Sequence, residues 1–335
     1  MKKLIYFYAF FMVGCLQAQE NIDDLLAAGI NDARRFTQSY LEPAADGIVH
    51  NLNNGWFNSG KSKKLFAFEV SIVGNVSFVK DEDKTFVLNT NDYENLRFQD
   101  GSISKPVSTA FGDLEGITVV AEGPLPGSGD DAVFDLPTGL GSADINFVPA
   151  AFLQVGVGLI NGIELKARYF PKVKTSDVEA GLYGVGIQYE FTSLLPADKL
   201  LPVAISGMIG YTHLDGTYDF TDTSIVDGDN QRIENSTDSW AFQAIASTKL
   251  PVFNVYGGLG YITGKSTNDL KGTYRVQSGV LATETIEDPF SVSSDVSGIR
   301  GTLGARLKIG FFRFNSDVTF AQFTTVSVGM SVGFR

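Results

Sequence analysis

The C-terminal third of the chain alternates between apolar and polar residues with a period of two. In the last segment the even positions are apolar and the odd positions are small or polar. The apolar set is Val326, Val328, Met330, Val332 and Phe334. Successive side chains of a strand point to opposite faces of the sheet. The segment therefore predicts a strand with one apolar and one polar face, and the two segments before it repeat the pattern.

Applied to the whole chain, the alternation predicts about ten strands, with twelve as the alternative. We expect them near 65–79, 148–160, 163–170, 181–192, 203–214, 239–248, 252–263, 298–309, 311–321 and 323–335. Short turns, such as Asn161-Gly162 and Ile309-Gly310, alternate with longer acidic connections. The long connections are expected at 171–180, 215–238 and 264–297. An even strand number with short turns on one side and long loops on the other is typical of bacterial outer-membrane barrels.

The aromatic residues of the apolar face gather at the two ends of these strands. One group would form a belt at the outer end: Tyr169, Tyr183, Tyr211, Trp240, Tyr261 and Phe320. A second group would form a belt at the inner end: Phe66, Phe68, Tyr189, Phe191, Phe253, Phe312, Phe314 and Phe334. Membrane interfaces favour aromatic rings at both boundaries. We therefore predict an all-β fold, a transmembrane antiparallel up-and-down barrel, closed because an open sheet edge is not stable in lipid.

The first 63 residues follow a different pattern. Residues 1–19 predict a cleaved signal peptide, with Lys2 and Lys3 before an apolar run. Residues 21–41 predict a helix, which Pro43 ends or restarts, and 47–60 is too turn-prone for regular structure. We expect residues 20–63 to form a helical plug inside the barrel or a periplasmic segment. Its apolar residues are Leu26, Ile30, Phe36, Tyr40, Trp56 and Phe57.

Residues 64–335 would form the barrel, interrupted by a polar insertion. Between 81 and 146 the alternation stops, and the segment is rich in glycine and aspartate. It leaves room for two short strands and is expected to be a long external loop.

Charge and cysteine content narrow the class of protein. The net charge is −12, and loss of the two signal lysines leaves 24 basic against 38 acidic residues, a charge of −14. Such acidity argues against nucleic acid as a partner. The single cysteine, Cys15, lies in the signal segment, so the mature chain would form no disulfide.

These features together resemble bacterial outer-membrane β-barrel proteins over almost the whole mature chain. More narrowly, Tyr40-Leu41-Glu42-Pro43, the stretch Leu52 to Asn58, and Lys63-Lys64 resemble a family of exported barrels of unassigned function. That family is similar in architecture to long-chain fatty-acid transporters, which thread an N-terminal hatch into the barrel. The resemblance implies contact with outer-membrane lipid and with the barrel-assembly machinery. The chain departs from those transporters in its lower strand number and in lacking Asn-Pro-Ala at the mature N-terminus.

The polar face of the strands supplies candidate residues for a solute path. The charged side chains expected in the lumen are Glu69, Glu164, Lys166, Arg168, Glu190, Arg300, Arg306, Lys308, Arg313 and Asp317. They would select solutes or pair with one another across the barrel. Four of them, Arg300, Arg306, Lys308 and Arg313, would form a basic wall that attracts a carboxylate. Inward glycines are numerous and would make space for the N-terminal segment.

An enzymatic or metal-dependent function has little support in the sequence. A lipid hydrolase needs a histidine paired with a serine, and only His50 and His213 exist, the latter beside Asp215. The acidic clusters Asp81-Glu82-Asp83, Asp130-Asp131 and Asp227-Gly228-Asp229-Asn230 match no defined calcium loop. We therefore predict no catalytic residues, no metal and no cofactor.

Two functions remain open from the sequence. The first is passive uptake of small hydrophobic or amphipathic solutes, such as a fatty-acid-like anion. The alternative is a non-transporting envelope barrel whose external loops bind partners.

Overall fold

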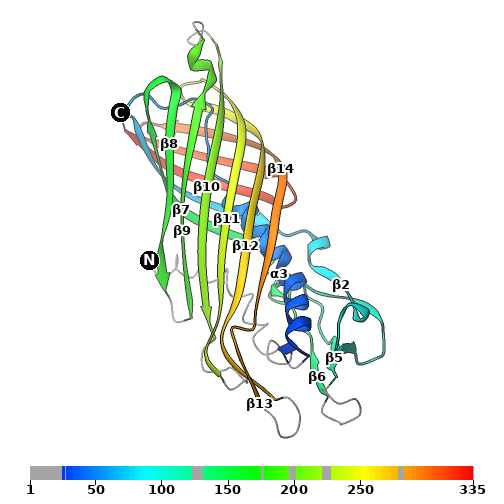
Figure 1. Ribbon diagram of the computed structural model, residues 1–335. Helices are drawn as coiled ribbons and strands as arrows, with labels where there is room; N and C mark the ends of the chain where they lie inside the picture. The colour runs from blue at the N-terminus through cyan, green and yellow to red at the C-terminus, as the bar shows by residue number, and fades with distance from the viewer. Residues whose placement is uncertain are drawn as a thin grey trace.

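Ten antiparallel strands close into a barrel in the computed structural model of the chain (Figure 1). The structure describes residues 25–334 except 27, 123–130, 175–176, 196–200, 221–227 and 278–282. The barrel strands are β1 (Phe68–Phe78), β7 (Phe147–Gly158), β8 (Ile163–Lys174), β9 (Val178–Glu190), β10 (Val203–Asp219), β11 (Gly228–Thr248), β12 (Phe253–Gln277), β14 (Phe290–Ile309), β15 (Phe312–Phe320) and β16 (Thr324–Phe334). Each pairs with its sequence neighbour, and β16 returns to β1 with Phe334 opposite Phe68. The prediction of about ten strands in a closed barrel is confirmed.

The two ends of the barrel differ. At the inner end lie the short turns, the start of β1 and the end of β16, and at the outer end lie the long connections. Two of the expected long loops are largely strand, since β11 has 21 residues and β12 has 25. A tilted strand needs only about ten residues to cross a membrane, so these strands continue past the outer belt. Beyond the outer belt neither face of these strands contacts lipid, so the apolar alternation stops. The backbone hydrogen bonds between β11 and β12 continue as far as Gly228, which lies opposite Tyr274.

The outward face of the barrel is apolar and exposed. Ile299 is 82% and Leu259 74% exposed, values that suit lipid contact and not water. At the outer belt Tyr169, Tyr183 and Trp240 are exposed, and at the inner belt Phe68 and Phe334 are exposed and their rings stack with centroids 5.2 Å apart. The outward apolar band and its two aromatic belts are those of a transmembrane barrel. Among the helices of the described residues, none combines the length and apolarity needed to span a membrane.

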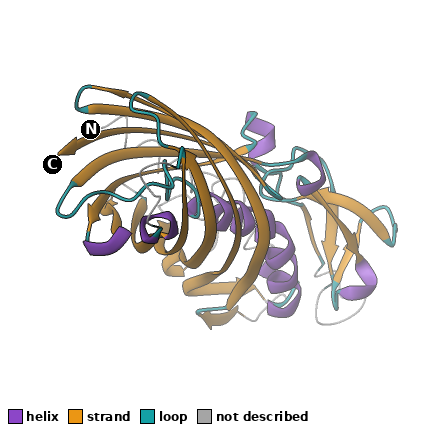
Figure 2. Cartoon of the chain, turned by 90° about the horizontal axis from the view of Figure 1, so that it is seen from above, coloured by secondary structure: helices purple, strands orange, loops and turns teal. Residues whose placement is uncertain are grey.

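The N-terminal helix differs from the prediction in both position and length. Helix α3 runs from Ile30 to Leu52, straight through Pro43, and lies inside the curve of the strands (Figure 2). Gly47, read from the sequence as a turn signal, is instead a contact point, because a Cβ there would lie 2.8 Å from Val148 Cγ2 on β7. Burial against the wall thus outweighs the weak helix propensity of proline and glycine. The segment 1–19 and the expected helix start at 21 lie outside the described residues.

The insertion is not a loop but a folded unit at the outer end. It holds five short strands where two were expected: β2 (Thr85–Asn89), β3 (Leu96–Phe98), β4 (Ser104–Ser108), β5 (Thr118–Ala121) and β6 (Ala132–Asp135). Between the barrel strands lie β13 (Thr283–Glu287), which pairs with the end of β12, and the short turns η4 (Ile160–Gly162) and η5 (Phe191–Leu194). Within the insertion, η1 (Asp81–Asp83), η2 (Thr90–Asp92) and η3 (Leu140–Ala143) connect the strands. Apolar alternation fails to predict such short strands, because only one or two residues of each enter a core.

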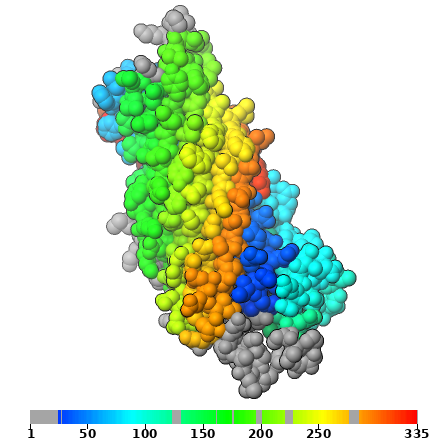
Figure 3. Space-filling view, viewed as in Figure 1, coloured from blue at the N-terminus to red at the C-terminus, as the bar shows by residue number. Residues whose placement is uncertain are grey.

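We call the insertion, the first half of α3 and the outer ends of β11 and β12 the cap. Its core includes Phe36, Tyr40, Leu88 and Leu96, each at most 2% exposed. In Figure 3 the first half of α3 lies at the surface between β14 and the insertion. The carboxylate of Asp32 on α3 accepts hydrogen bonds from the backbone N–H groups of residues 94, 95 and 96, at 2.7–3.1 Å. The cap is therefore joined to the helix by both apolar packing and charge-assisted hydrogen bonds.

Candidate functional site: a plugged lumen

The residues that fill the lumen are the last turn of α3 and the extended segment after it. We call residues 49–64 the plug. Of the six residues expected to plug the barrel, only Trp56 and Phe57 lie in the lumen, 1% and 6% exposed. Leu26, Phe36 and Tyr40 pack in the cap, and Ile30 is 38% exposed. The expectation of an N-terminal helical plug is confirmed by α3, and the plug continues beyond the helix as extended chain.

A single glycine turns the chain from the helix into the plug. Gly55 has φ +72°, a conformation that favours glycine. A Cβ there would lie 2.6 Å from Val73 on β1, so space excludes a side chain as well. The side chains of Asn53 and Asn54 close the helix end by donating to the carbonyls of Val49 and His50. The asparagine- and glycine-rich stretch of the sequence is therefore the helix terminus.

Arg168 on β8 holds the turn of the plug from the barrel wall. Its guanidinium lies 3.5 Å from the ring centroid of Trp56 and 4.1 Å from that of Phe152. The same group donates to the carbonyls of Leu52 and Asn54 at 2.6 and 3.1 Å. Arg168 is 1% exposed, and this combination of stacking and forked donation is available to arginine but not to lysine.

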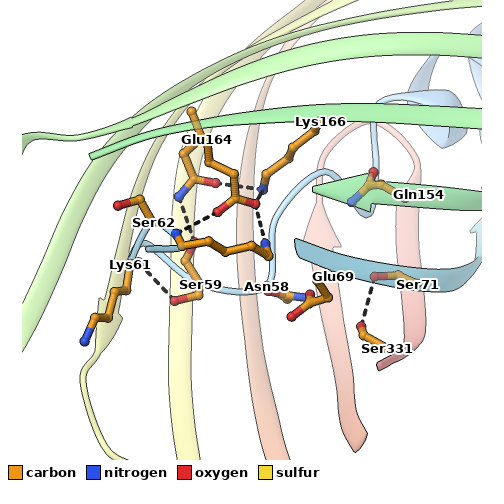
Figure 4. A network of polar contacts seen from close by, with 12 residues as sticks. Asn58, Ser59, Lys61, Ser62, Glu69, Ser71, Gln154, Glu164, Lys166 and Ser331 are labelled. Atoms are coloured by element: carbon orange, nitrogen blue, oxygen red, sulfur yellow. Dashed lines mark hydrogen bonds and ion pairs between the residues drawn. The ribbon is translucent and has the colours of Figure 1, made fainter. Parts of the chain in front are cut away.

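A buried ion-pair network anchors the middle of the plug (Figure 4). Lys166 Nζ donates to the carbonyl of Trp56 at 2.8 Å and to Gln188 Oε1 at 2.7 Å. Glu164 Oε1 accepts from Lys63 Nζ at 2.5 Å and lies 3.7 Å from Lys166 Nζ. Lys166 and Glu164 face the lumen from β8, while Lys63 belongs to the plug. Charged groups of the barrel wall therefore have some of their ion-pair and hydrogen-bond partners in the plug.

The carboxylate of Glu190 and a serine of β11 hold the far end of the plug. Glu190 Oε2 accepts from the backbone N–H and the hydroxyl of Ser62 at 2.7 and 2.8 Å. Ser247 Oγ accepts from the backbone N–H of Gly60 at 2.9 Å and lies 3.4 Å from Ser59 Oγ. Glu190 is the last residue of β9 and Ser247 lies near the end of β11, so two strands of the wall hold this end of the plug.

Three of the four residues of the predicted basic wall, Arg306, Lys308 and Arg313, line one space at the inner end, and Arg300 lies apart from them. Arg306 and Arg313 share the carboxylate of Glu69, at 2.9 and 2.8 Å, and Arg306 also donates to Asn58 of the plug. Arg300 lies deeper, where it donates to the side chain of Asn54. Lys308 is exposed at the inner end of β14. Arg306 and Arg313 therefore share one negative charge, and Arg300 holds the plug.

Asp317 faces a tyrosine instead of a cation. Tyr256 OH donates to Asp317 Oδ2 at 2.7 Å, and both are buried. The ring of Tyr256 meets that of Phe57 edge to face, with centroids 5.8 Å apart. Apolar side chains also surround the plug, with Phe152, Met208, Ile245 and Ile262 all buried around it.

Several inward glycines leave the space that plug side chains occupy. A Cβ on Gly210 would lie 2.6 Å from the Trp56 ring, and one on Gly186 2.9 Å from it. A Cβ on Gly258 would lie 2.7 Å from Phe57. The prediction that inward glycines accommodate the N-terminal segment is confirmed at these positions. The partner is the extended plug and not the helix that we expected.

An apolar cavity lies beside α3 in the outer half of the lumen. Residues of α3 form one side, and the wall of β7, β9, β10, β11 and β12 forms the other. The lining residues are Leu41, Ala44, Ala45, Ile48, Leu52, Pro149, Ala150, Ala180, Leu214, Gly216, Ile233, Asn235 and Asn268. The volume of the cavity, measured as the space open to the centre of a water-sized sphere, is about 80 Å³. No pattern in the sequence predicted this cavity, because it depends on where α3 crosses the wall.

His213 has carboxylates and not a serine as partners. Its Nδ1 lies 2.8 Å from Asp238 Oδ1 and its Nε2 2.9 Å from Asp215 Oδ1. Both ring nitrogens are thereby engaged, and neither is directed at a serine hydroxyl in the described residues. Within those residues, no group of three or more acidic, histidine or cysteine side chains could hold a metal ion. Asp130 and Asp227 of the acidic clusters lie outside the described residues.

Comparison with known proteins places the chain in a family. Residues 1–334 match the family described as "Family of unknown function (DUF6588)". The chain belongs to this family. No curated protein sequence matches it.

Among solved structures, this DUF6588 chain is similar to outer-membrane barrels. Ail, the attachment invasion locus protein of Yersinia pestis, is 9% identical, with 81% of this chain and 98% of that chain covered and a TM-score of 0.27. The outer membrane protease OmpT of Escherichia coli is 9% identical, with 81% and 99% covered and a TM-score of 0.34. The toluene transporter TodX of Pseudomonas putida is 8% identical, with 88% and 94% covered and a TM-score of 0.26. The barrel itself is defined by the closed strand pairing and the exposed apolar outward face.

Proposed function

We propose that this outer-membrane barrel passively admits small apolar or amphipathic solutes and that the plug is its gate. The observation that carries the proposal is the apolar cavity beside α3. Charged side chains such as Arg168 and Glu190 hold the plug elsewhere in the lumen, whereas only two polar side chains, those of Asn235 and Asn268, line this cavity. An apolar cavity stays dry and favours an apolar ligand. Its volume suits a short alkyl chain or part of a ring.

The way in which the plug is held supports its role as a gate. Hydrogen bonds donated by Arg168 and Lys166, and one accepted by Glu190, hold it. Each of these bonds involves a charged group and contributes about 1.5–3 kcal/mol net. The buried apolar anchors, Trp56 and Phe57, add about 1.5–3 kcal/mol each. Displacement of the plug is therefore a rare event, but it leaves the barrel wall intact.

A reversible covalent lock tests the gate. The hydroxyls of Ser59 on the plug and Ser247 on β11 are 3.4 Å apart, so the pair Ser59→Cys and Ser247→Cys can form a disulfide. The matched control is Ser71→Cys with Ser331→Cys, which are register partners on β1 and β16 with hydroxyls 3.0 Å apart. That disulfide crosslinks the wall and leaves the plug free.

Uptake of an uncharged lipophilic fluorophore by cells expressing each variant gives the readout. We expect the oxidised plug lock to stop uptake and a reductant to restore it, while the oxidised control takes up the fluorophore like the native barrel. The substitution Ala44→Leu, which extends into the cavity from α3, should slow uptake without any crosslink. Equal uptake by the oxidised and reduced plug lock would refute the gate.

The folded cap favours a second function, an envelope barrel whose external surface binds a partner. The cap has an apolar core of its own, in which Leu96 is 0% exposed, and a loop that only connects two strands does not require such a core. The same lock distinguishes the two functions. If cells whose barrel is locked retain full envelope resistance to detergent, and cells lacking the barrel do not, the activity lies in the cap and not in the lumen.

A further inference from the structure

A basic vestibule opens at the inner end of the barrel. It lies between the end of the plug, the β11–β12 turn and the inner ends of β14 and β15, and the centre of a water-sized sphere can reach about 430 Å³ of it. This space is separate from the apolar cavity, with which it shares no lining residue. It is therefore a second place where a ligand could bind.

The vestibule has a large excess of positive charge. Eight lysine and arginine residues line it, against the two carboxylates of Glu69 and Glu164. A third carboxylate, that of Glu190, lies 3.9 Å from Lys249 Nζ. Among the described residues, three carboxylates leave five of these cations uncompensated, on a chain whose net charge is −12. A concentration of positive charge this strong, opposed to the charge of the rest of the molecule, focuses anions into the space.

Three of the cations have no carboxylate partner among the described residues: Lys61, Lys64 and Lys308. Lys61 and Lys64 belong to the plug and are exposed, and Lys308 lies on β14 opposite Arg313. Figure 4 shows the Lys61 side chain directed away from the Glu164 and Lys166 network. These three ammonium groups neither hold the plug in place nor neutralise a carboxylate of the wall. Neither of these structural roles therefore explains their presence.

The rim of the vestibule is apolar on the lipid side. Phe68 and Phe334, the stacked pair of the inner belt, line it, and so do Leu250 and Pro251 of the β11–β12 turn. The positive charge is thereby presented at the level of the membrane interface, beside the inner leaflet. A ligand with a strongly anionic head and an apolar body would satisfy both surfaces.

We propose that this vestibule binds a phosphate-bearing group. Five uncompensated cations exceed what one carboxylate requires and suit an anion carrying up to two charges on several oxygens, contacted by lysines as point charges and by the Arg306 and Arg313 guanidiniums as forks. Two sources share this chemistry: a soluble phosphate compound and the headgroup of an anionic phospholipid. The site does not depend on passage of solutes through the barrel.

The test compares a vestibule variant with a variant of equal charge change. The triple substitution Lys61→Gln, Lys64→Gln and Lys308→Gln removes only side chains without ion-pair partners, so the fold should not change. The control replaces Lys80, Lys84 and Lys105, at the opposite end of the molecule, by glutamine. Full-length protein in neutral phosphatidylcholine nanodiscs is titrated with inorganic pyrophosphate by calorimetry. In a second arm, native mass spectrometry counts phosphatidylglycerol molecules retained from mixed-lipid nanodiscs.

Each lysine near an anionic group contributes on the order of 1 kcal/mol, less with salt. We therefore expect the vestibule variant to bind about 10- to 100-fold more weakly, with the control unchanged. A loss of pyrophosphate binding identifies a soluble ligand, and a loss confined to the retained phosphatidylglycerol identifies a lipid headgroup. If native protein binds neither probe, or if both variants lose binding equally, the proposal is wrong.

Discussion

The cap and the lumen hold the same N-terminal segment by different forces. In the cap, α3 presents Phe36 and Tyr40 to a continuous apolar core, and water has no access to them. In the lumen, the plug is held by wall residues such as Arg168 and Glu190, with Trp56 and Phe57 as its main apolar anchors. Apolar packing is lost entirely when two surfaces separate, whereas water can replace most of the polar links. The comparison predicts a fixed outer half and a more easily released inner half.

The largest effect is expected from an apolar truncation in the cap. Phe36→Ala removes a ring that is 1% exposed and lies 5.7 Å from the Tyr40 ring and 5.6 Å from the Phe86 ring, centroid to centroid. Loss of a buried phenylalanine costs about 3–5 kcal/mol. Hydrogen exchange should show faster opening of residues 30–41 and of β3 and β5.

Ile30→Ala is the control on the same helix. Ile30 is 38% exposed, so its truncation should cost less than about 1 kcal/mol. If Phe36→Ala accelerates exchange in residues 53–62 as much as in the cap, the two regions open together and the distinction between them fails.

A smaller but more local effect is expected from the arginine that holds the plug. Arg168→Met keeps much of the side-chain volume but leaves the carbonyls of Leu52 and Asn54 without their donor. We expect a loss of about 2–3 kcal/mol, from the unsatisfied acceptors and the lost stacking on Trp56. Exchange should rise in residues 52–58 and remain native in the cap. A rise in β3 and β5 of the same size would contradict the prediction.

The strands could be predicted because membrane and lumen impose opposite polarity on alternate residues. This holds for β16, where Val326 to Phe334 alternate strictly, and it fails for the outer half of β12, where neither face meets lipid. The predicted strand end at Thr263 therefore holds only for the lipid-facing part of β12, because the strand itself continues to Gln277. Hydrogen-bonded pairing without a polarity difference leaves no periodic signal in the sequence.

The path of the plug could not be predicted from local pattern. Pro43 and Gly47 are both weak helix formers, and only the close approach to Val148 explains why the helix continues through them. Strand alternation determines which face a side chain occupies, and for this reason the sequence assigns the candidate charges to the inner face. Their partners were not predictable, since Lys166 and Arg168 bind backbone carbonyls of a segment more than a hundred residues away.

A third prediction tests the polar attachment at the inner end. Glu190→Gln retains one acceptor oxygen but loses the charge that strengthens the two hydrogen bonds from Ser62. The expected loss is about 1–2 kcal/mol, seen as faster exchange of residues 60–64. Ser71→Ala, which removes a wall hydrogen bond to Ser331 away from the plug, should leave that exchange unchanged. An equal rise in both variants would mean that the plug reports general loosening of the barrel.

The smallest effect concerns pH at the boundary between the two regions. Asp46 of α3 accepts a hydrogen bond from Gln322, in the outer turn between β15 and β16, at 3.0 Å. Burial raises the pKa of Asp46 from 3.8 to about 6, and the nearby carboxylates of Glu42 and Asp83 add to the rise. A carboxyl whose pKa is higher in the folded state binds protons more tightly there, so the folded state gains stability as pH falls.

The contact between α3 and the outer turn should therefore be most stable below pH about 4 and weaken as pH rises to about 6, with no further change above. Exchange of residues 42–52, corrected for the intrinsic pH dependence of exchange, measures this difference. Asp46→Asn should remove it and hold the contact in its low-pH state, while exchange in the cap core around Phe36 should not change with this substitution. If residues 42–52 of the native protein exchange equally fast at pH 4 and pH 7, the prediction is wrong. Asp46 is then solvated, and no titratable contact holds α3 against the outer turn.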